Sequence, residues 1–318
     1  MNELRKDYIL DRWVIIAEDR GKRPQQFVHR AEKVEKGICY FCPGNENMTP
    51  PEIARIERNG RWIVRSFPNK FPATSRKKGK IRENFLKSFY PYGTHEVVVE
   101  TPEHDKNLGD LDKEHISLLL QLYIKRLREI KEDKSIKYVL IFKNKGGNAG
   151  TSLEHSHSQI IGLPIIPKLV QDEVLAAEEY RRRNGNCPFC KIWKREIKTE
   201  RGIFENEHTV AIAPFASRFP FEVWLIPKRH MNSLEEMKNE EINSFAEILQ
   251  KILSRLNSSL NYPPYNFYLH LSPEGEDLHF HLELTPRLTK WAGFELGSGI
   301  IINVMPPEMA AEHYRGKN

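Results

Sequence analysis

The residues best suited to chemistry are cysteines and histidines that recur in the same order in the two halves of the chain. Each half contains a Cys-x-x-Cys, Cys39-Tyr40-Phe41-Cys42 and Cys187-Pro188-Phe189-Cys190, and later a His-x-His, His155-Ser156-His157 and His279-Phe280-His281. A two-residue spacer lets both thiolates reach one metal ion from a tight turn. The duplicated pattern therefore predicts two metal sites.

A tetrahedral zinc ion needs four ligands, and downstream histidines can complete each cysteine pair. The predicted ligand sets are Cys39, Cys42, His104 and His155 in the first half, and Cys187, Cys190, His230 and His279 in the second. His95, His208 and His270 are the next ligand candidates, and reduced cysteines or a redox pair are the alternative for each Cys-x-x-Cys. Sites closed by four protein ligands hold a fold and do no chemistry, so we predict two structural zinc ions, the first anchoring the strand of His157.

The segment before His155 has the composition of an anion-binding loop. Three glycines within residues 146–150 let backbone amides approach a phosphate closely. The predicted nucleotide contacts here are Asn144, Gly150 and Thr151, with further donors expected from Lys143, Lys145 and Ser152.

His157 is the predicted nucleophile beside this loop. On a strand, alternation places His155, His157 and Gln159 on one face, so one histidine can bind metal while the next stands free. An imidazole is a good nucleophile toward phosphorus and a good leaving group, as a double displacement needs. The His155 carbonyl could hold the proton on the far ring nitrogen. In the second half, the acidic segment 273–277 would repel a phosphate; a packed, non-catalytic His157 remains the alternative.

The elements that position these residues are also duplicated. Apolar residues spaced by three and four predict helices around 116–127 and 242–252, and β-like runs cover 97–99, 138–142, 223–225 and 266–270. A further helix is expected at 169–183. The pattern predicts an α+β fold of two homologous modules, 1–165 and 166–318, each an antiparallel sheet with helices packed on it.

Composition and charge limit the possible partners and location of the protein. The 318 residues are 39% hydrophobic and 29% charged with a formal net charge of +6, so an anionic partner is expected. No apolar run follows Met1 and none approaches a membrane span, which predicts a cytoplasmic protein without membrane contact and with reduced cysteines. A zinc-stabilised RNA-binding protein would need clustered basic and aromatic residues. Lysine and arginine are instead interleaved with acids, so no nucleic-acid partner is expected.

In these motifs and their order the chain resembles, over nearly its whole length, the galactose-1-phosphate uridylyltransferase family of the histidine-triad superfamily. The resemblance implies two fused histidine-triad-like halves, homodimers, and a His-x-His-x-Gln motif. The third motif position forms a covalent nucleotidyl-histidine, here on His157. Gln159 would hydrogen-bond the phosphoryl oxygens, and Ser152 stands at the phosphate-binding serine of the family.

Three further segments resemble binding elements of the family. Lys22-Arg23-Pro24 resembles a basic element whose arginine, Arg23, contacts phosphate. Segment 67–72 resembles the nucleoside-binding element, with Asn69 and Phe71, and segment 291–299 resembles the sugar-binding element, with Phe294 and Glu295. The resemblance implies transfer of a uridylyl group from UDP-glucose to galactose 1-phosphate, with a nucleoside diphosphate sugar and a sugar 1-phosphate as partners.

Two departures leave the substrate open. The usual His-Pro-His-Gly-Gln is replaced by His155-Ser156-His157-Ser158-Gln159, and Asn-Asp-Phe by Asn69-Lys70-Phe71. The serine form and the second Cys-x-x-Cys resemble the ADP-glucose phosphorylase branch, which transfers AMP from ADP-glucose to phosphate; this is the alternative function. Histidine-triad hydrolases are a further rival, but they usually carry a histidine at the Gln159 position.

Overall fold

The computed structural model describes residues 2–18, 37–77, 79 and 85–316. The predicted phosphate contact Arg23 lies outside these residues.

One large antiparallel sheet carries most of the described chain. Among the described residues it has ten strands, in the order β3-β4-β5-β7-β6-β11-β12-β10-β9-β8. The strands are β3 (Ala54–Arg58), β4 (Arg61–Pro68), β5 (Thr94–Val99), β6 (Tyr138–Lys145), β7 (His157–Leu163), β8 (Gly202–Glu205), β9 (Thr209–Ile212), β10 (Val223–Pro227), β11 (Tyr265–His270) and β12 (His281–Pro286).

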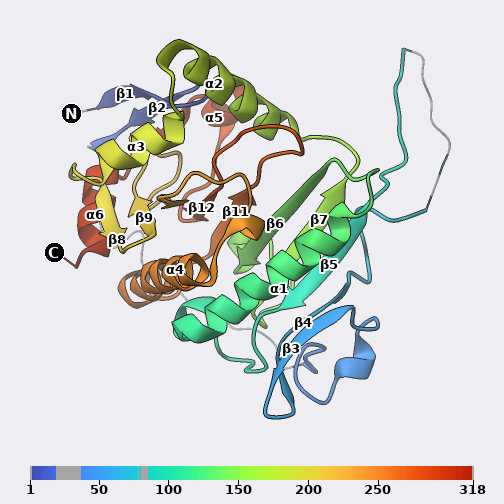
Figure 1. Cartoon of the computed structure of the whole chain (residues 1–318). Coiled ribbons are helices and arrows are strands. Elements are labelled where there is room, and N and C mark those ends of the chain that lie inside the picture. The colour runs from blue at the N-terminus through green and yellow to red at the C-terminus, as the bar shows by residue number, and fades with distance from the viewer. Residues whose placement is uncertain (1, 19–36, 78, 80–84, 317–318) are drawn as a thin grey trace.

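The duplication read from the sequence is visible in this strand order. Strands β3 to β7 and β8 to β12 occupy mirrored positions, and they meet where β6 pairs with β11, with Asn144 opposite Asn266. The α+β fold is thus confirmed. The two halves share one continuous sheet (Figure 1), because pairing of β6 with β11 satisfies the backbone groups that each strand would otherwise expose at an edge.

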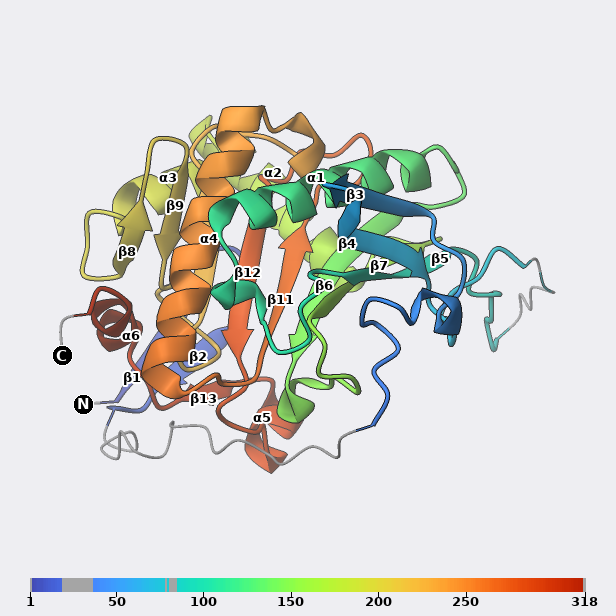
Figure 2. The same cartoon turned by 90° about the horizontal axis from the view of Figure 1, so that it is seen from below.

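Two long amphipathic helices cover one face of the sheet, α1 (Lys113–Lys131) and α4 (Asn239–Leu260) (Figure 2). Asp112 caps α1 by accepting a hydrogen bond from the His115 N–H at 2.7 Å. Both helices bury rows of leucine and isoleucine against the strands and against each other, including Ile116, Leu120, Leu249 and Ile252. Their apolar spacing, which predicted them, is therefore the source of their packing.

The histidine motifs lie on the opposite face of the sheet, and shorter helices and turns complete the described chain. The remaining helices are α2 (Lys168–Asn184), α3 (Pro188–Glu196), α5 (Gly293–Ser298) and α6 (Pro307–Tyr314), and short 3₁₀ turns span Glu46–Met48, Leu108–Asp110, Gly147–Ala149 and Leu234–Glu236. The helix predicted at 169–183 is α2.

A small sheet ties the beginning of the chain to its end. It contains β1 (Glu3–Lys6), β2 (Trp13–Ile16) and β13 (Ile301–Asn303), with β13 parallel to β2. Ile301 is buried there with Val14 and Ile16. Residues 2–18 consequently lie beside the second half of the chain, where Arg5 donates to Glu308 of α6 at 2.9 Å (Figure 2). The division into 1–165 and 166–318 remains a prediction.

No helix in the described part of the chain has the length and apolar character needed to cross a membrane.

Candidate active site

The glycine loop, residues 146–150, joins β6 to β7, and two of its glycines adopt backbone conformations that favour glycine. Gly146 has φ 82° and Gly150 has φ 87°, both in the region that other residues avoid. A Cβ on Gly146 would lie 2.9 Å from the Pro264 Cβ. The Asn266 side-chain amide donates to the Ala149 carbonyl and to the Asn144 side-chain oxygen, both at 2.8 Å. The loop is therefore pinned from the neighbouring strand β11.

His157 begins β7 beside this loop, and its hydrogen bonding leaves one ring nitrogen open. Its Nδ1 donates to the His155 carbonyl at 2.8 Å, so Nε2 carries the lone pair in the neutral ring. The Phe41 ring packs edge-on at 5.4 Å between centroids. Burial lowers the pKa of His157, and the Lys143 ammonium lowers it further. The geometry thus presents a neutral imidazole, the form that attacks phosphorus.

The two lysines expected to contact an anion face the other way. Lys143 is buried beneath β7, where its Nζ donates to the Glu100 carboxylate at 2.5 Å and to the Ser156 hydroxyl and the His157 carbonyl at 3.0 Å. Lys145 donates to the Asn257 side chain at 3.4 Å. The prediction for these lysines is wrong because β6 extends through residue 145, so alternation turns both toward the helices.

The two motif serines also point into this interior. The Ser156 hydroxyl donates to the Glu100 carboxylate at 2.6 Å, and the Ser158 hydroxyl lies 2.5 Å from that of Tyr123 on α1. Each serine therefore has a buried polar partner on the face opposite His157.

Gln159 lies on the His157 face and is linked to the predicted nucleoside segment. Its side-chain oxygen is 2.8 Å from Nε2 of His95, and the Ala73 N–H donates to Nδ1 of the same ring at 3.0 Å. The Asn69 oxygen accepts from the Phe71 N–H at 2.9 Å, and the Phe71 ring is 82% exposed. An open aromatic ring beside fixed amides can stack a nucleobase.

The structure brings together Cys39, Cys42, His104 and His155 as one group of possible metal ligands. Cys39 Sγ is 3.4 Å from Nδ1 of His155, and Cys42 Sγ is 3.3 Å from Nδ1 of His104. Sulfur and nitrogen ligands of a tetrahedral zinc ion are about 3.6 Å apart. The His155 Nε2 donates to the Thr101 carbonyl at 2.7 Å, which leaves Nδ1 unprotonated and free to bind a metal. The donor set fits such an ion.

Cys187, Cys190, His230 and His279 form a second group of the same kind. Cys190 Sγ is 3.4 Å from Nδ1 of His279 and 3.7 Å from that of His230. The far nitrogens are held by the Pro227 carbonyl at 3.0 Å and the Asp277 carboxylate at 2.6 Å, as in orienting partners of metal-bound histidines. The next ligand candidates lie elsewhere: His95 contacts Gln159, His208 lies near Glu207, and His270 binds Glu173.

Other predicted residues are spread along the described chain. Ser152 is exposed in the glycine loop, and the Thr151 hydroxyl donates to the Leu153 carbonyl at 3.1 Å. Phe294 and Glu295 lie on α5, where Glu295 accepts from the Ala292 N–H at 2.9 Å.

A family model described as galactose-1-phosphate uridyl transferase, N-terminal domain, matches residues 1–167. The chain belongs to the galactose-1-phosphate uridylyltransferase family. A second model, for a domain of unknown function, matches residues 87–314.

Relatives and solved structures match nearly the full length. ADP-glucose phosphorylase of Arabidopsis thaliana is 33% identical over 98% of this chain and 92% of its own length. Galactose-1-phosphate uridylyltransferase of Thermotoga maritima is 31% identical over 99% and 98%. The crystal structure of the Arabidopsis ADP-glucose phosphorylase with bound ADP-glucose matches with a TM-score of 0.86 at 34% identity, covering 99% of both chains. A uridylyltransferase structure matches with a TM-score of 0.78 at 30% identity, covering 100% and 98%. The chain is an enzyme of the nucleotidyltransferase type.

The second-half counterpart of His157 is enclosed. His281 donates from Nδ1 to the His279 carbonyl at 3.0 Å, as His157 does to His155, but its ring is fully buried against Phe189 and His270. Its Nε2 is buried and has no hydrogen-bond partner among the described residues. Desolvation lowers the pKa of His281 to about 3.

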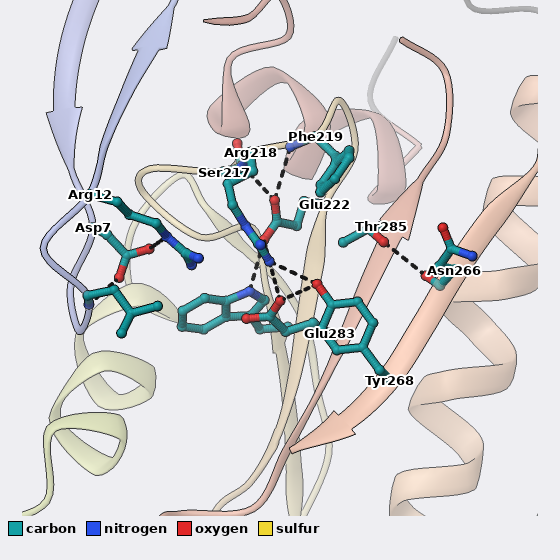
Figure 3. Close-up of polar contacts among 12 residues, drawn as sticks. Asp7, Arg12, Ser217, Arg218, Phe219, Glu222, Asn266, Tyr268, Glu283 and Thr285 are labelled. Atoms are coloured by element: carbon teal, nitrogen blue, oxygen red, sulfur yellow. Dashed lines mark hydrogen bonds and ion pairs between the residues drawn. The ribbon is translucent and has the colours of Figure 1, made fainter. Parts of the chain in front are cut away.

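A charged network lies next to His281, and Figure 3 shows Arg218, Tyr268 and Glu283 within it. The Arg218 guanidinium donates to Glu283 at 2.5 Å and to the Tyr268 hydroxyl at 2.9 Å, and Tyr268 donates to Glu283 at 2.7 Å. Together with Glu173 and His270, Glu283 and His281 form a third cluster of ligand-capable side chains. Reasoning from sequence missed this cluster because its carboxylates stand in no recognisable spacing. The signals present were the second His-x-His and His270, a candidate ligand for a different site.

Proposed function

We propose that the protein transfers a nucleotidyl group between a nucleoside diphosphate hexose and a phosphate-bearing acceptor, through a covalent intermediate on His157. The observation that carries the proposal is the His157 ring, whose Nδ1 donates to the His155 carbonyl at 2.8 Å beside the glycine loop. That hydrogen bond leaves Nε2 as the nucleophilic atom.

The reaction proceeds in two displacements. The Nε2 lone pair attacks the α-phosphorus, an N–P bond forms, and the P–O bond to the sugar 1-phosphate breaks with its electron pair on the leaving oxygen. An acceptor oxygen then attacks the same phosphorus, and the electron pair of the N–P bond returns to Nε2. The His155 carbonyl stabilises the ring charge that develops between the steps. Gln159, Ser152 and Arg23 bind the phosphoryl oxygens, since positioning and electrostatics dominate such transfers. The Gly150 and Thr151 N–H groups donate to the Gly147 and Gly146 carbonyls at 2.9 and 3.4 Å, so these amides shape the loop instead.

UDP-glucose is the first candidate donor and galactose 1-phosphate the acceptor. The family model and the Thermotoga relative support this assignment. Asn69 and Phe71 would hold the nucleoside, Asn144 the phosphates, and Phe294 and Glu295 the hexose, as the family resemblance implies. A homodimer is part of the same proposal and is tested by light scattering of the purified protein.

ADP-glucose, with inorganic phosphate as acceptor, is the second candidate. It is favoured by the similarity to the Arabidopsis enzyme and by the motif serines. Ser156 and Ser158 have buried partners in Glu100 and Tyr123, so proline and glycine at these positions would leave those groups without their hydrogen bonds. The interior is built for the serine form of the motif.

Both Cys-His groups are proposed to hold zinc in structural roles. Bound zinc would neutralise the thiolates of each pair and fix the chain on either side of it. The first group, through His155, would anchor the residue that precedes the nucleophile by two positions. Metal analysis of the purified protein should give two zinc ions per chain.

The test is the intact mass of the protein after separate incubation with UDP-glucose and ADP-glucose without acceptor. A uridylyl adduct discharged by galactose 1-phosphate supports the first donor, and an adenylyl adduct discharged by inorganic phosphate supports the second. His157→Ala should form neither adduct while keeping its metal. Folded, zinc-loaded protein that forms no adduct with either donor would contradict the covalent mechanism for these donors.

A further inference from the structure

Among the residues that the structure describes, His95 is the one side chain hydrogen-bonded both to Gln159 and to the backbone of Ala73, directly after the predicted nucleoside segment 67–72. It lies on β5, next to β7 in the sheet, with its ring on the same face as Gln159. Its backbone carbonyl accepts from the Asn69 N–H at 2.8 Å. The ring therefore sits between the group expected to bind the nucleoside and the group expected to bind the phosphoryl oxygens.

The proton on this ring has a single consistent position. The Ala73 N–H can only donate, so Nδ1 of His95, 3.0 Å away, is the acceptor. A ring with both nitrogens accepting would be an imidazolate, so Nε2 of the neutral ring carries the hydrogen. Desolvation lowers the pKa of His95, which favours that neutral ring.

The proton position fixes the Gln159 amide. A protonated Nε2 donates to Oε1 of Gln159 at 2.8 Å, so the amide oxygen is held and the amide nitrogen keeps its hydrogens for a ligand. The Asn69 amide nitrogen, 3.2 Å from the same ring nitrogen, is fixed as a donor because its oxygen accepts from Phe71. Its hydrogens are likewise left for a ligand.

We propose that His95 is a positioning residue that holds the Gln159 amide with its N–H groups available to the phosphoryl oxygens, and that ties this orientation to the backbone at Ala73. The inference rests on the proposed function. A phosphate offers only acceptors, so a Gln159 amide turned by 180° would present its oxygen to the phosphate and repel it. The ring makes that orientation costly, because the turned amide nitrogen would face the protonated Nε2, and moving the proton to Nδ1 would set it against the Ala73 N–H.

Two substitutions of His95 test its two ring hydrogen bonds, to Gln159 and to Ala73, one at a time. In His95→Gln the side-chain amide reaches the position of Nε2 and can still donate to Gln159. In His95→Asn it reaches the position of Nδ1, can still accept from Ala73, and leaves Gln159 unheld. With whichever donor labels the wild-type protein, H95N should lower the rate of His157 nucleotidylation by about 10- to 100-fold, part of the 10²–10³ that a lost oxyanion donor costs. H95Q should recover most of that loss.

A Gln159→Ala background tests whether His95 acts through Gln159. The H95N substitution should change the rate little in that background, while KM for the donor and the zinc content stay close to those of Q159A alone. Full additivity of the two losses, or an H95N rate equal to that of wild type, would overturn the inference and leave the covalent mechanism untouched.

Nitrogen NMR of the His95 ring distinguishes failure of this inference from failure of the proposed function, because it needs no turnover. The expected signature is a protonated Nε2 and an unprotonated Nδ1. A proton on Nδ1 would refute the positioning argument even if the nucleotidyl adduct forms. If neither donor labels the wild-type protein, the transfer assignment fails, and the NMR result alone then decides the hydrogen-bond argument.

Discussion

Replacing Lys143 by methionine should be among the most destabilising single changes in the first half of the chain. The Lys143 side chain is 1% exposed and the Glu100 side chain 0%, with Nζ and carboxylate 2.5 Å apart. Methionine is of similar length but carries no charge. The substitution therefore leaves the Glu100 carboxylate buried without its cation and removes the donors to Ser156 and the His157 carbonyl.

The magnitude follows from the burial. Removing one partner of a buried ion pair costs about 3–5 kcal/mol, because the remaining charge is neither solvated nor paired. Against a total stability of about 5–15 kcal/mol for an ordinary protein, that is a large fraction. Replacing both partners removes the unpaired charge, so K143M/E100Q should recover at least half of the loss. Lys134, whose ion pair with Glu274 is 73% and 79% exposed, provides the control, and K134M should change stability by less than about 1 kcal/mol.

The assay is urea unfolding of wild type, K143M, K134M, E100Q and the double variant, followed by circular dichroism. Equal stability of K143M and K134M would refute the reasoning. It would mean that leaving the Glu100 carboxylate without its cation costs no stability, which a buried carboxylate does not allow. A double variant no more stable than K143M would show that the loss comes from lysine packing and not from the unpaired carboxylate.

Three further predictions concern other parts of the molecule. Gly146→Ala should lower the nucleotidylation rate at least about tenfold, because its Cβ would meet Pro264 and its φ of 82° disfavours alanine; unchanged single-turnover kinetics would contradict this. Cys187→Ser should cost one zinc ion per chain by metal analysis and several degrees in Tm, while His157 labelling persists. Arg229 lowers the pKa of Glu241 to about 2 from 4.5, so the stability that Glu241 adds is present above pH 4.5 and lost as pH falls toward 2. Glu241→Gln should thus be less stable at pH 7 by at most about 1 kcal/mol, because the Arg229 side chain is 43% exposed. The difference should vanish in acid, as measured by urea unfolding at several pH values.

Much of the fold followed from periodicity and from the repeat. The apolar spacing located α1 and α4, the helix expected at 169–183 is α2, and the β-like runs located β5, β6, β10 and β11. The ligand sets followed from the duplication, because two Cys-x-x-Cys pairs with histidines in register leave few ways to complete two tetrahedra. These signals are local or repeated, which is why a single sequence can carry them.

What the sequence did not reveal depends on partners far along the chain. Alternation along a strand states which face a residue occupies but not what covers that face. Lys143 therefore read as a phosphate donor, although it lies on the face covered by α1 and α4. His95 read as a possible metal ligand because nothing local indicates that Ala73 and Gln159 lie at either end of its ring. The pairing of residues 301–303 with β2 is equally non-local.

In the proposed mechanism, the enclosed second half accounts for a single nucleophile in a duplicated motif. His281 repeats the hydrogen bond of His157 to the carbonyl two residues earlier, so tautomer alone does not distinguish them. The residue two positions later does: Glu283 stands where Gln159 stands, and an anionic carboxylate there would repel a phosphoryl group. Arg218 neutralises Glu283 from within the protein, and Phe189 covers the His281 ring, so the space that a nucleotide needs is filled by the chain itself. A single substitution that opened space around His281 would expose buried charge. It would not create a phosphate-binding loop, because the second half has an acidic segment in place of the glycine loop. In the proposed mechanism, two features together confine catalysis to the first half: the donor amide of Gln159 and the glycine loop, where the second half has Glu283 and an acidic segment.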